Sequence, residues 1–214
     1  MSKNTCCACG DFPWEGRGAT KDISGCRFSL YPMTNDFVPL ILNALDKTDT
    51  GKVWSRSDAL STVYRGKLIH IFDAVRGLFV SAYSDGVHMA LEAQVSKGCP
   101  GDTDGDSFLE TDDLRINKPK LLDIHFPVLC KLALYPLGSG DYINHIAHVV
   151  RMAESAKLNP ASVHYATRIA GDIHDVMDFL EAACEYIQNH VPHYVLTYTL
   201  SVNSPTEEKK NEKI

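Results

Sequence analysis

The sequence has 214 residues, of which 44% are hydrophobic, which is enough to bury the core of one domain or of two small ones. The formal net charge of -6 argues against a nucleic-acid-binding protein, because such a protein needs a basic face to neutralise phosphates. No segment has the apolar length of a membrane span, and the first residues lack the apolar centre of a signal peptide. We therefore expect a cytoplasmic protein without membrane insertion.

Residues 1–24 are predicted to form a flexible arm, because their glycine, proline and polar residues show no helical or strand period. Three of the seven cysteines lie there, namely Cys6, Cys7 and Cys9. A metal site would need a second pair of cysteine or histidine ligands at a suitable spacing, and none follows. The odd, scattered cysteines also predict no disulfide framework. We expect neither a bound metal nor a cofactor.

The first folded unit is predicted over residues 25–98. It begins with a β-prone run at 26–31, which ends at Pro32 because proline has no N–H group to donate. A helix capped by Thr34 or Asn35 follows. Its apolar residues are spaced three and four apart, which predicts one buried stripe made of Phe37, Leu40, Ile41, Ala44 and Leu45.

Two short strands are predicted next, over residues 53–56 and 60–65. Apolar residues at helical spacing then predict a long helix over residues 68–82, which ends before Gly86. Residues 89–95 alternate between the two faces of a strand, with one face in a core. The predicted unit is therefore βαββαβ, the ferredoxin-like arrangement.

A shift of about 105 residues aligns the sequence with itself, which indicates an internal repeat. The matched pairs include Leu30 with Leu134, Tyr31 with Tyr135, Thr62 with Thr167, and His88 with His193. We predict an α+β protein that is a tandem repeat of two ferredoxin-like (βαββαβ) units with antiparallel sheets. The second unit spans residues 129–205, residues 99–128 form a linker, and residues 206–214 form a charged tail.

The second unit is predicted to follow the order of the first. Its first strand covers residues 131–135 and its first helix begins at Asp141 and ends near Lys157. A strand over residues 163–168 and a helix with an apolar face from Ile173 to Ile187 follow. Alternation from residue 194 to residue 202 predicts the last strand.

Several features that could carry chemistry fail a closer test. The carboxylates at residues 102–106 do not match an EF-hand calcium loop, because its sixth position is Ser107 and its twelfth is Asp113. His145 and His148 lie three apart on a helix, and His174 precedes an aspartate, but the spacing predicts no third metal ligand. His88 and His193 are duplicated, and each begins a strand after a turn, which suits an edge position as well as a site.

The sequence contains no phosphate-binding glycine loop and no catalytic triad, so we expect no enzymatic activity. A ferredoxin-like unit carries its helices on one face of the sheet, and the other face needs a cover. The duplication suggests a second sheet as that cover, and oligomerisation is the alternative. The residues best placed to shape an equivalent pocket in each unit are Leu30, Tyr31 and Thr62 and their counterparts Leu134, Tyr135 and Thr167.

Longer runs in both units resemble one family. They are RFSLYPMT at 27–34, LDKTDTGKVW at 45–54, STVYRG at 61–66, GCPGDT at 98–103, LYP at 134–136, SVHYA at 162–166, GDIHDV at 171–176 and SVNSP at 201–205. These runs are similar to the YkoF family of bacterial thiamine/hydroxymethylpyrimidine-binding proteins. The resemblance covers about residues 25–205, and the second unit is the more diverged of the two.

The resemblance implies a homodimer of tandem ferredoxin-like repeats without catalytic activity, in which each repeat binds thiamine or its pyrimidine moiety. It also implies a role in the uptake or salvage of that precursor and a functional link to a transporter. Leu30 and Thr62 would contact one ligand, and Leu134 and Thr167 the other. A threonine hydroxyl and a strand edge can match the donors and acceptors of an aminopyrimidine, while leucine and tyrosine cover its faces.

Two other functions stay open from the sequence. The protein could be a small ferredoxin-like enzyme acting on another heterocycle, which predicts a buried histidine or aspartate with a shifted pKa in a pocket. It could instead be a regulatory module that senses a ligand and passes its occupancy to a partner protein.

Overall fold

The computed structural model describes residues 23–97 and 108–206. The predictions for residues 1–22, for the carboxylates at 102–106 and for the tail from residue 207 lie outside these residues. The described part forms β1 (Ser24–Pro32), α1 (Phe37–Lys47), β2 (Trp54–Ser57), β3 (Thr62–Gly66), α2 (Leu68–Ala82), β4 (Met89–Lys97), α3 (Lys118–Leu121), β5 (Pro127–Leu137), α4 (Tyr142–Ser155), β6 (Ala161–Ser162), β7 (Thr167–Asp172), α5 (Ile173–Gln188) and β8 (His193–Val202). None of these helices has the length and apolar character needed to cross a membrane.

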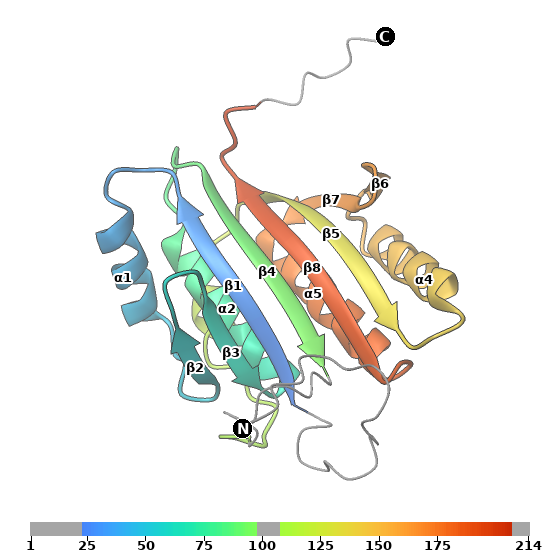
Figure 1. The fold of residues 1–214 in the computed structure, drawn as a ribbon. Helices are drawn as coiled ribbons and strands as arrows, with labels where there is room; N and C mark the ends of the chain where they lie inside the picture. Colours follow the sequence, from blue (N-terminus) through green and yellow to red (C-terminus); the bar gives the residue numbers. More distant parts are fainter. Residues whose placement is uncertain (1–22, 98–107, 207–214) are drawn as a thin grey trace.

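All strands belong to one antiparallel sheet in the order β2-β3-β1-β4-β8-β5-β7-β6. Each half is a βαββαβ unit, so the prediction of an α+β fold with two ferredoxin-like units is confirmed. The units join where β4 pairs with β8, from Met89 opposite Val202 to Lys97 opposite Tyr194. Figure 1 shows α2 and α5 behind the middle of the sheet, with α1 and α4 at its two sides.

The suggestion that one unit's sheet covers the other is therefore wrong. The two units lie edge to edge and extend a single sheet, because their last strands pair along their whole length. The helices lie on one face, and within the described residues the opposite face carries no second layer (Figure 1).

The two units are related by an approximate two-fold axis through the middle of the β4–β8 pair. Ala93 lies opposite Tyr198, its own counterpart in the second unit. His88 Nε2 lies 3.3 Å from Ser201 Oγ, and His193 Nε2 lies 3.4 Å from Ser96 Oγ. The histidines therefore do not mark sheet edges: they lie at the ends of the two central strands and join the units.

The core is continuous across both units because α2 and α5 pack under the centre of the sheet. Three cysteines lie in it without a disulfide, namely Cys26, Cys130 and Cys184. Burial raises the pKa of Cys26 to about 12, although a hydrogen bond with Tyr198 opposes this shift. The pKa values of the other two thiols are also raised by burial. These neutral thiols are core residues rather than nucleophiles.

Part of the predicted linker ties the helices of both units together. The Asp73 carboxylate on α2 accepts the backbone N–H groups of Ile116, Asn117 and Lys118, each at 2.8 Å. The Lys118 ammonium donates to both oxygens of Asp178 on α5 at 2.8 Å. Asp73 and Asp178 are counterparts in the repeat, so the same position in each unit holds the linker.

Asp178 also accepts a hydrogen bond from Arg76, whose side chain is fully buried on α2. Burial pushes the pKa of Asp178 upward, but the hydrogen bonds from Lys118 and Arg76 outweigh it, and the net pKa lies below the usual value. The carboxylate is thus ionised at neutral pH and compensates the buried guanidinium.

The predicted buried stripe on the first helix is confirmed at Ala44 and wrong at Phe37 and Leu45, while Leu40 and Ile41 are half-buried. Ala44 is the buried residue of α1, whereas Phe37 is 49% exposed and Leu45 is 38% exposed. The helix begins after Asp36, whose side chain makes no capping hydrogen bond, so neither predicted cap is used. The physical reason is the position of α1: it lies beside the sheet rather than beneath it (Figure 1), and part of its apolar surface stays uncovered.

The third strand of each unit begins later than predicted, at Thr62 in β3 and at Thr167 in β7. In the first unit the Asp58 side chain accepts the N–H groups of Leu60 and Ser61 and holds both residues in a turn. In the second unit residues 163–166 form the turn between β6 and β7. Local hydrogen bonds in the two turns thus make β3 and β7 begin later than their β-prone residues predicted.

Candidate ligand-binding site

In each unit the first strand extends beyond the strand beside it. β1 pairs with β3 only as far as Phe28 opposite Thr62, so among the described residues, residues 29–32 have no strand partner on that side, although Ser29 Oγ donates to Leu60 O at 2.9 Å. β5 pairs with β7 only as far as Leu132 opposite Thr167, so residues 133–137 have no strand partner on that side within the described part of the chain. We call each of these gaps a notch. Its exposed strand edge leaves backbone N–H and C=O groups available to a ligand.

The structure brings the predicted site residues to these two notches. Leu30 and Tyr31 lie on the overhanging part of β1, and Thr62 lies at the inner end of the first notch. Because strand side chains alternate, Leu30 faces the helices and packs against the core, whereas Tyr31 is 49% exposed.

The second notch has the same arrangement. Leu134 is 7% exposed and faces the helices, Tyr135 is 50% exposed, and Thr167 lies at the inner end. Ser162 stands directly opposite Thr167 in the β6–β7 pair. In the first unit the corresponding hydroxyls of Ser57 and Thr62 lie 2.8 Å apart. Each notch therefore has a leucine and a tyrosine on its overhanging strand and a hydroxyl pair at one end.

The second notch contains a cavity of about 500 Å³, which lies between β5, α4 and the β6–β7 turn. This volume lies in the usual range for small-molecule sites. It contains the three predicted residues of this unit together with residues that the sequence did not mark as ligand-binding: Tyr142, Ile146, Val149, Val150 and Ala153 from α4, Ser162, Tyr165 and Ala166 from the hairpin, and Phe179 from α5. The signal that could have found the α4 residues is their apolar character on a helix that flanks the sheet.

No charged side chain, histidine or cysteine lines this cavity among the residues that the structure describes. Its polar groups are the hydroxyls of serine, threonine and tyrosine and the backbone of the strand edge. Such a site can hold a flat, largely apolar ring that carries a few hydrogen-bonding groups. It offers no group that could act as a strong base or nucleophile at neutral pH.

A shallow groove of about 320 Å³ crosses the open face of the sheet. It runs over the middle strands and is bordered by charged side chains, among them Arg27, Glu92 and Lys131. Arg27 donates to Asp58 at 2.9 Å, which anchors the turn between β2 and β3 at the rim of the groove. The groove is therefore more polar than the cavity in the second notch.

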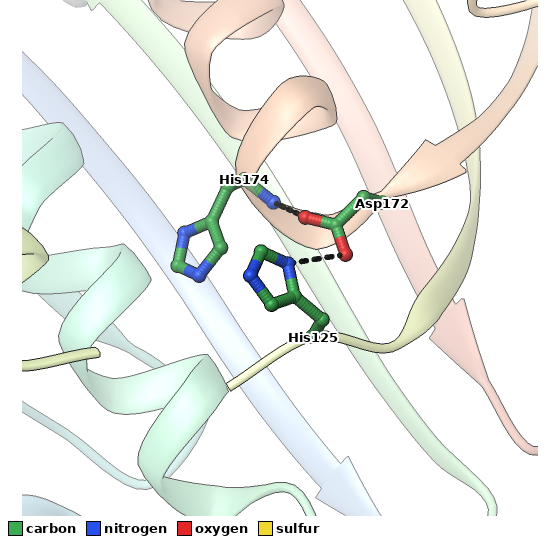
Figure 2. A group of neighbouring side chains, drawn as sticks. All are labelled: His125, Asp172 and His174. Carbon is green, nitrogen blue, oxygen red and sulfur yellow. Dashed lines mark hydrogen bonds and ion pairs between the residues drawn. The ribbon is translucent and has the colours of Figure 1, made fainter. Parts of the chain in front are cut away.

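A second candidate site, drawn in Figure 2, lies at the start of α5. His125, Asp172 and His174 place one possible metal-ligating atom each within 4.8 Å of one another. Asp172 Oδ1 accepts the backbone N–H of His174 at 2.9 Å, and Oδ2 accepts a hydrogen bond from His125 Nδ1 at 3.1 Å. The carboxylate therefore caps the helix and holds His125 at the same time.

Both ring nitrogens of His174 are already engaged. Nε2 lies 3.1 Å from the carbonyl oxygens of Leu121 and Ile124, which only accept, so this nitrogen carries the proton. Nδ1 lies 3.5 Å from the guanidinium of Arg76. A metal would have to displace two carbonyl groups or approach a buried cation. The cluster thus acts as a hydrogen-bonded clamp between the linker and α5.

The histidines His145 and His148 also have structural neighbours. His145 Nδ1 lies 3.1 Å from the Tyr186 hydroxyl, and the ring of His148 stacks on Tyr186 with 4.1 Å between ring centroids. These contacts join α4 to α5. Neither histidine lines the cavity of the second notch.

The sequence matches known proteins over both units. Residues 23–102 and 127–207 each match the family described as the YKOF-related family. A relative from Bacillus subtilis (strain 168), named "Putative HMP/thiamine-binding protein YkoF", is 41% identical over 194 residues, which cover 91% of this chain and 96% of the relative. The chain therefore belongs to the YKOF-related family, with one match to the family in each of its two ferredoxin-like units.

Proposed function

We propose that the protein binds thiamine or its hydroxymethylpyrimidine moiety (HMP), with one ligand in the notch of each unit. The observation that carries this proposal is the duplication of the site: both units place a Leu-Tyr pair on the overhanging strand and a threonine at the end of the adjacent strand. The relative's printed name assigns HMP/thiamine binding to that protein, and its identity over most of this chain supports the same ligand class here.

The chemistry of the notch fits an aminopyrimidine. The unpaired edge of β5 supplies backbone donors and acceptors in the plane of a bound ring, and Thr167 supplies a hydroxyl at its end. Leu134 and Phe179 provide apolar surface for the faces of the ring. In the first unit the edge of β1, Leu30 and Thr62 would do the same.

The binding role is proposed without catalysis. An enzyme would need an acid, a base or a nucleophile beside the bound ring, and the described lining of the cavity contains only apolar groups, hydroxyls and backbone. The buried histidine of α2, His70, faces Lys52 and Asp112 rather than a notch. Within this proposal the protein acts as a carrier or sensor in precursor uptake or salvage and works in the cytoplasm beside a transporter.

The open face of the sheet is proposed to be covered by a second copy of the chain. It carries both signs of charge, with Arg27 and Lys131 against Glu92, which suits contact with an identical face turned by a two-fold axis. Gln94→Lys, in the middle of this face, should shift the mass in light scattering from dimer to monomer. Asp46→Lys on the exposed side of α1 is the matched control, and a monomeric wild type would contradict the dimer.

Isothermal titration with thiamine and with HMP tests the binding proposal. Two ligands should bind per chain, and Thr62→Val and Thr167→Val should each weaken one of the two by about 0.5–1.5 kcal/mol, because each removes one hydrogen bond. Thr199→Val on the open face is the control and should change neither. The absence of binding with both ligands would contradict the proposed function.

A further inference from the structure

The mouth of the second notch is formed by three tyrosines from three separate elements. Tyr135 comes from β5, Tyr142 from α4 and Tyr165 from the β6–β7 turn, and all three line the cavity. Tyr135 and Tyr142 are about half exposed, and Tyr165 is 103% exposed. Large aromatic side chains are seldom left so exposed around an apolar cavity unless they contact something there.

The backbone that presents Tyr165 is strained. His164 and Tyr165 have φ values of 48° and 60°, in the left-handed region, and the Val163 N–H donates to Ala166 O at 3.0 Å across them. A two-residue hairpin turn of this kind favours glycine or asparagine, which adopt positive φ at low cost. A bulky tyrosine at such a position is often associated with function rather than stability.

The corresponding turn of the first unit has neither the left-handed backbone nor the tyrosine. Its residues have no positive φ, and Asp58 stabilises it by accepting the N–H groups of Leu60 and Ser61. Leu60, the counterpart of Tyr165, is aliphatic and lines the groove on the open face of the sheet. Of the three aromatic positions, the described part of the first unit therefore keeps the counterparts of Tyr135 and Tyr142, which are Tyr31 and Phe37.

Aromatic faces attract cations through their electron-rich π system, and tyrosine does so well. No acidic or basic side chain lines the described cavity, so the three rings are its main source of charge preference. A cationic heteroaromatic ring at the mouth would be attracted to them, whereas a phosphate group would find no positive partner there.

This inference rests on the proposed function. We propose that Tyr165 closes over the ligand of the second unit, and that Tyr135, Tyr142 and Tyr165 together make this unit prefer a ligand with a cationic ring, such as intact thiamine. The first unit discriminates less between a charged and an uncharged ring. The two copies of the site have thus diverged in specificity through the turn beside each notch.

The test compares thiamine with its uncharged analogue, in which the positively charged nitrogen of the thiazolium ring is replaced by carbon. Calorimetry on the full chain gives, for each site, the ratio of the affinity for thiamine to the affinity for the analogue. This ratio should be about three- to tenfold larger at one site than at the other. Tyr165→Leu, which copies the first unit, should abolish most of this preference and change binding of the uncharged analogue less than about twofold. Tyr165→Phe, which keeps an aromatic face, should retain it.

Leu60→Ala in the first unit is the control and should leave the preference unchanged. Equal losses for thiamine and the analogue in Tyr165→Leu would overturn the inference while leaving the proposed function intact, since Tyr165 would then be only an apolar cover. A preference lost in Leu60→Ala would also overturn it. If neither compound nor HMP binds the wild type, the proposed function fails and the inference fails with it.

Discussion

The two notches are formed by the same strand pairing but are flanked by different turns. In both units the first strand overhangs the third by the same register, with a threonine at the inner end. In the first unit Asp58 organises the adjacent turn, and hydrogen bonds from Arg27, Leu60 and Ser61 lower its pKa to about 2. In the second unit the turn has left-handed residues instead. Strand pairing was thus kept after duplication, while the hydrogen bonding and backbone conformation of the adjacent turn diverged.

The contacts between the linker and the helices α2 and α5 also combine equivalent positions with different partners. Asp73 and Asp178 occupy equivalent positions, but Asp73 accepts three backbone N–H groups, whereas Asp178 receives Lys118 and the buried Arg76. Asp73 is almost fully buried, and the Asp178 side chain is 47% exposed. Asp73 therefore fixes the backbone of the linker, and Asp178 compensates the positive charge of Arg76.

The largest expected effect separates these two carboxylates. Asp73→Ala leaves several buried N–H groups without an acceptor and should lower the free energy of unfolding by about 3 kcal/mol. Asp178→Ala leaves Arg76 without its carboxylate, but water reaches this site, so we expect a loss of about 2 kcal/mol. Urea unfolding measures both values. A larger loss for Asp178→Ala would reverse the assignment of the two roles.

A smaller effect of opposite sign is expected at the strained turn. His164→Gly should raise the free energy of unfolding by about 0.5–1 kcal/mol, because glycine adopts the left-handed conformation without a side-chain clash. Ala59→Gly, in the corresponding turn of the first unit, should not stabilise, since no residue there has a positive φ. Thermal unfolding of the two variants decides the matter, and stabilisation by both would remove the contrast between the turns.

The smallest effect concerns acid sensitivity. Burial and the nearby Lys52 lower the pKa of His70, whose counterpart in the second unit is Asp175. The unfolded chain, with a histidine pKa of about 6.5, then binds more protons than the folded chain in the window just below that pH. The stability contributed by neutral His70 is present above about pH 6.5 and is lost as the pH falls toward the folded pKa.

His70→Gln should therefore lose less stability than the wild type between pH 7 and pH 5, as measured by the midpoint of thermal unfolding. His190→Gln, at an exposed histidine, serves as the control and should behave as the wild type. If His70→Gln and the wild type lose stability in parallel, the acid sensitivity does not come from this position.

Much of the fold could be predicted because duplication leaves a direct trace in the sequence. The repeat alignment that matches Thr62 with Thr167 also matches their positions in the sheet, because each pairs with the last paired residue of the first strand of its unit. The arrangement of the units could not be predicted, since it depends on β4 pairing with β8 across more than a hundred residues. Hydrophobic periodicity also overestimated the burial of α1, because it indicates an apolar helix face but does not identify the element that covers this face.

The site was predictable in part for the same reason. Leu30, Leu134 and the two threonines were found by matching the repeats and by the family resemblance, and the structure places them at the notches. Phe179 and Tyr165 were missed, because one reaches the cavity through tertiary packing and the other through a turn with positive φ. Neither contact leaves a periodic signal in the sequence.

The most direct test of the central claim is a crystal structure of the protein with bound HMP. We expect a pyrimidine ring in each notch, against the unpaired edge of β1 or β5 and beside Thr62 or Thr167. A ring found in the groove across the open face of the sheet, with both notches empty, would contradict it.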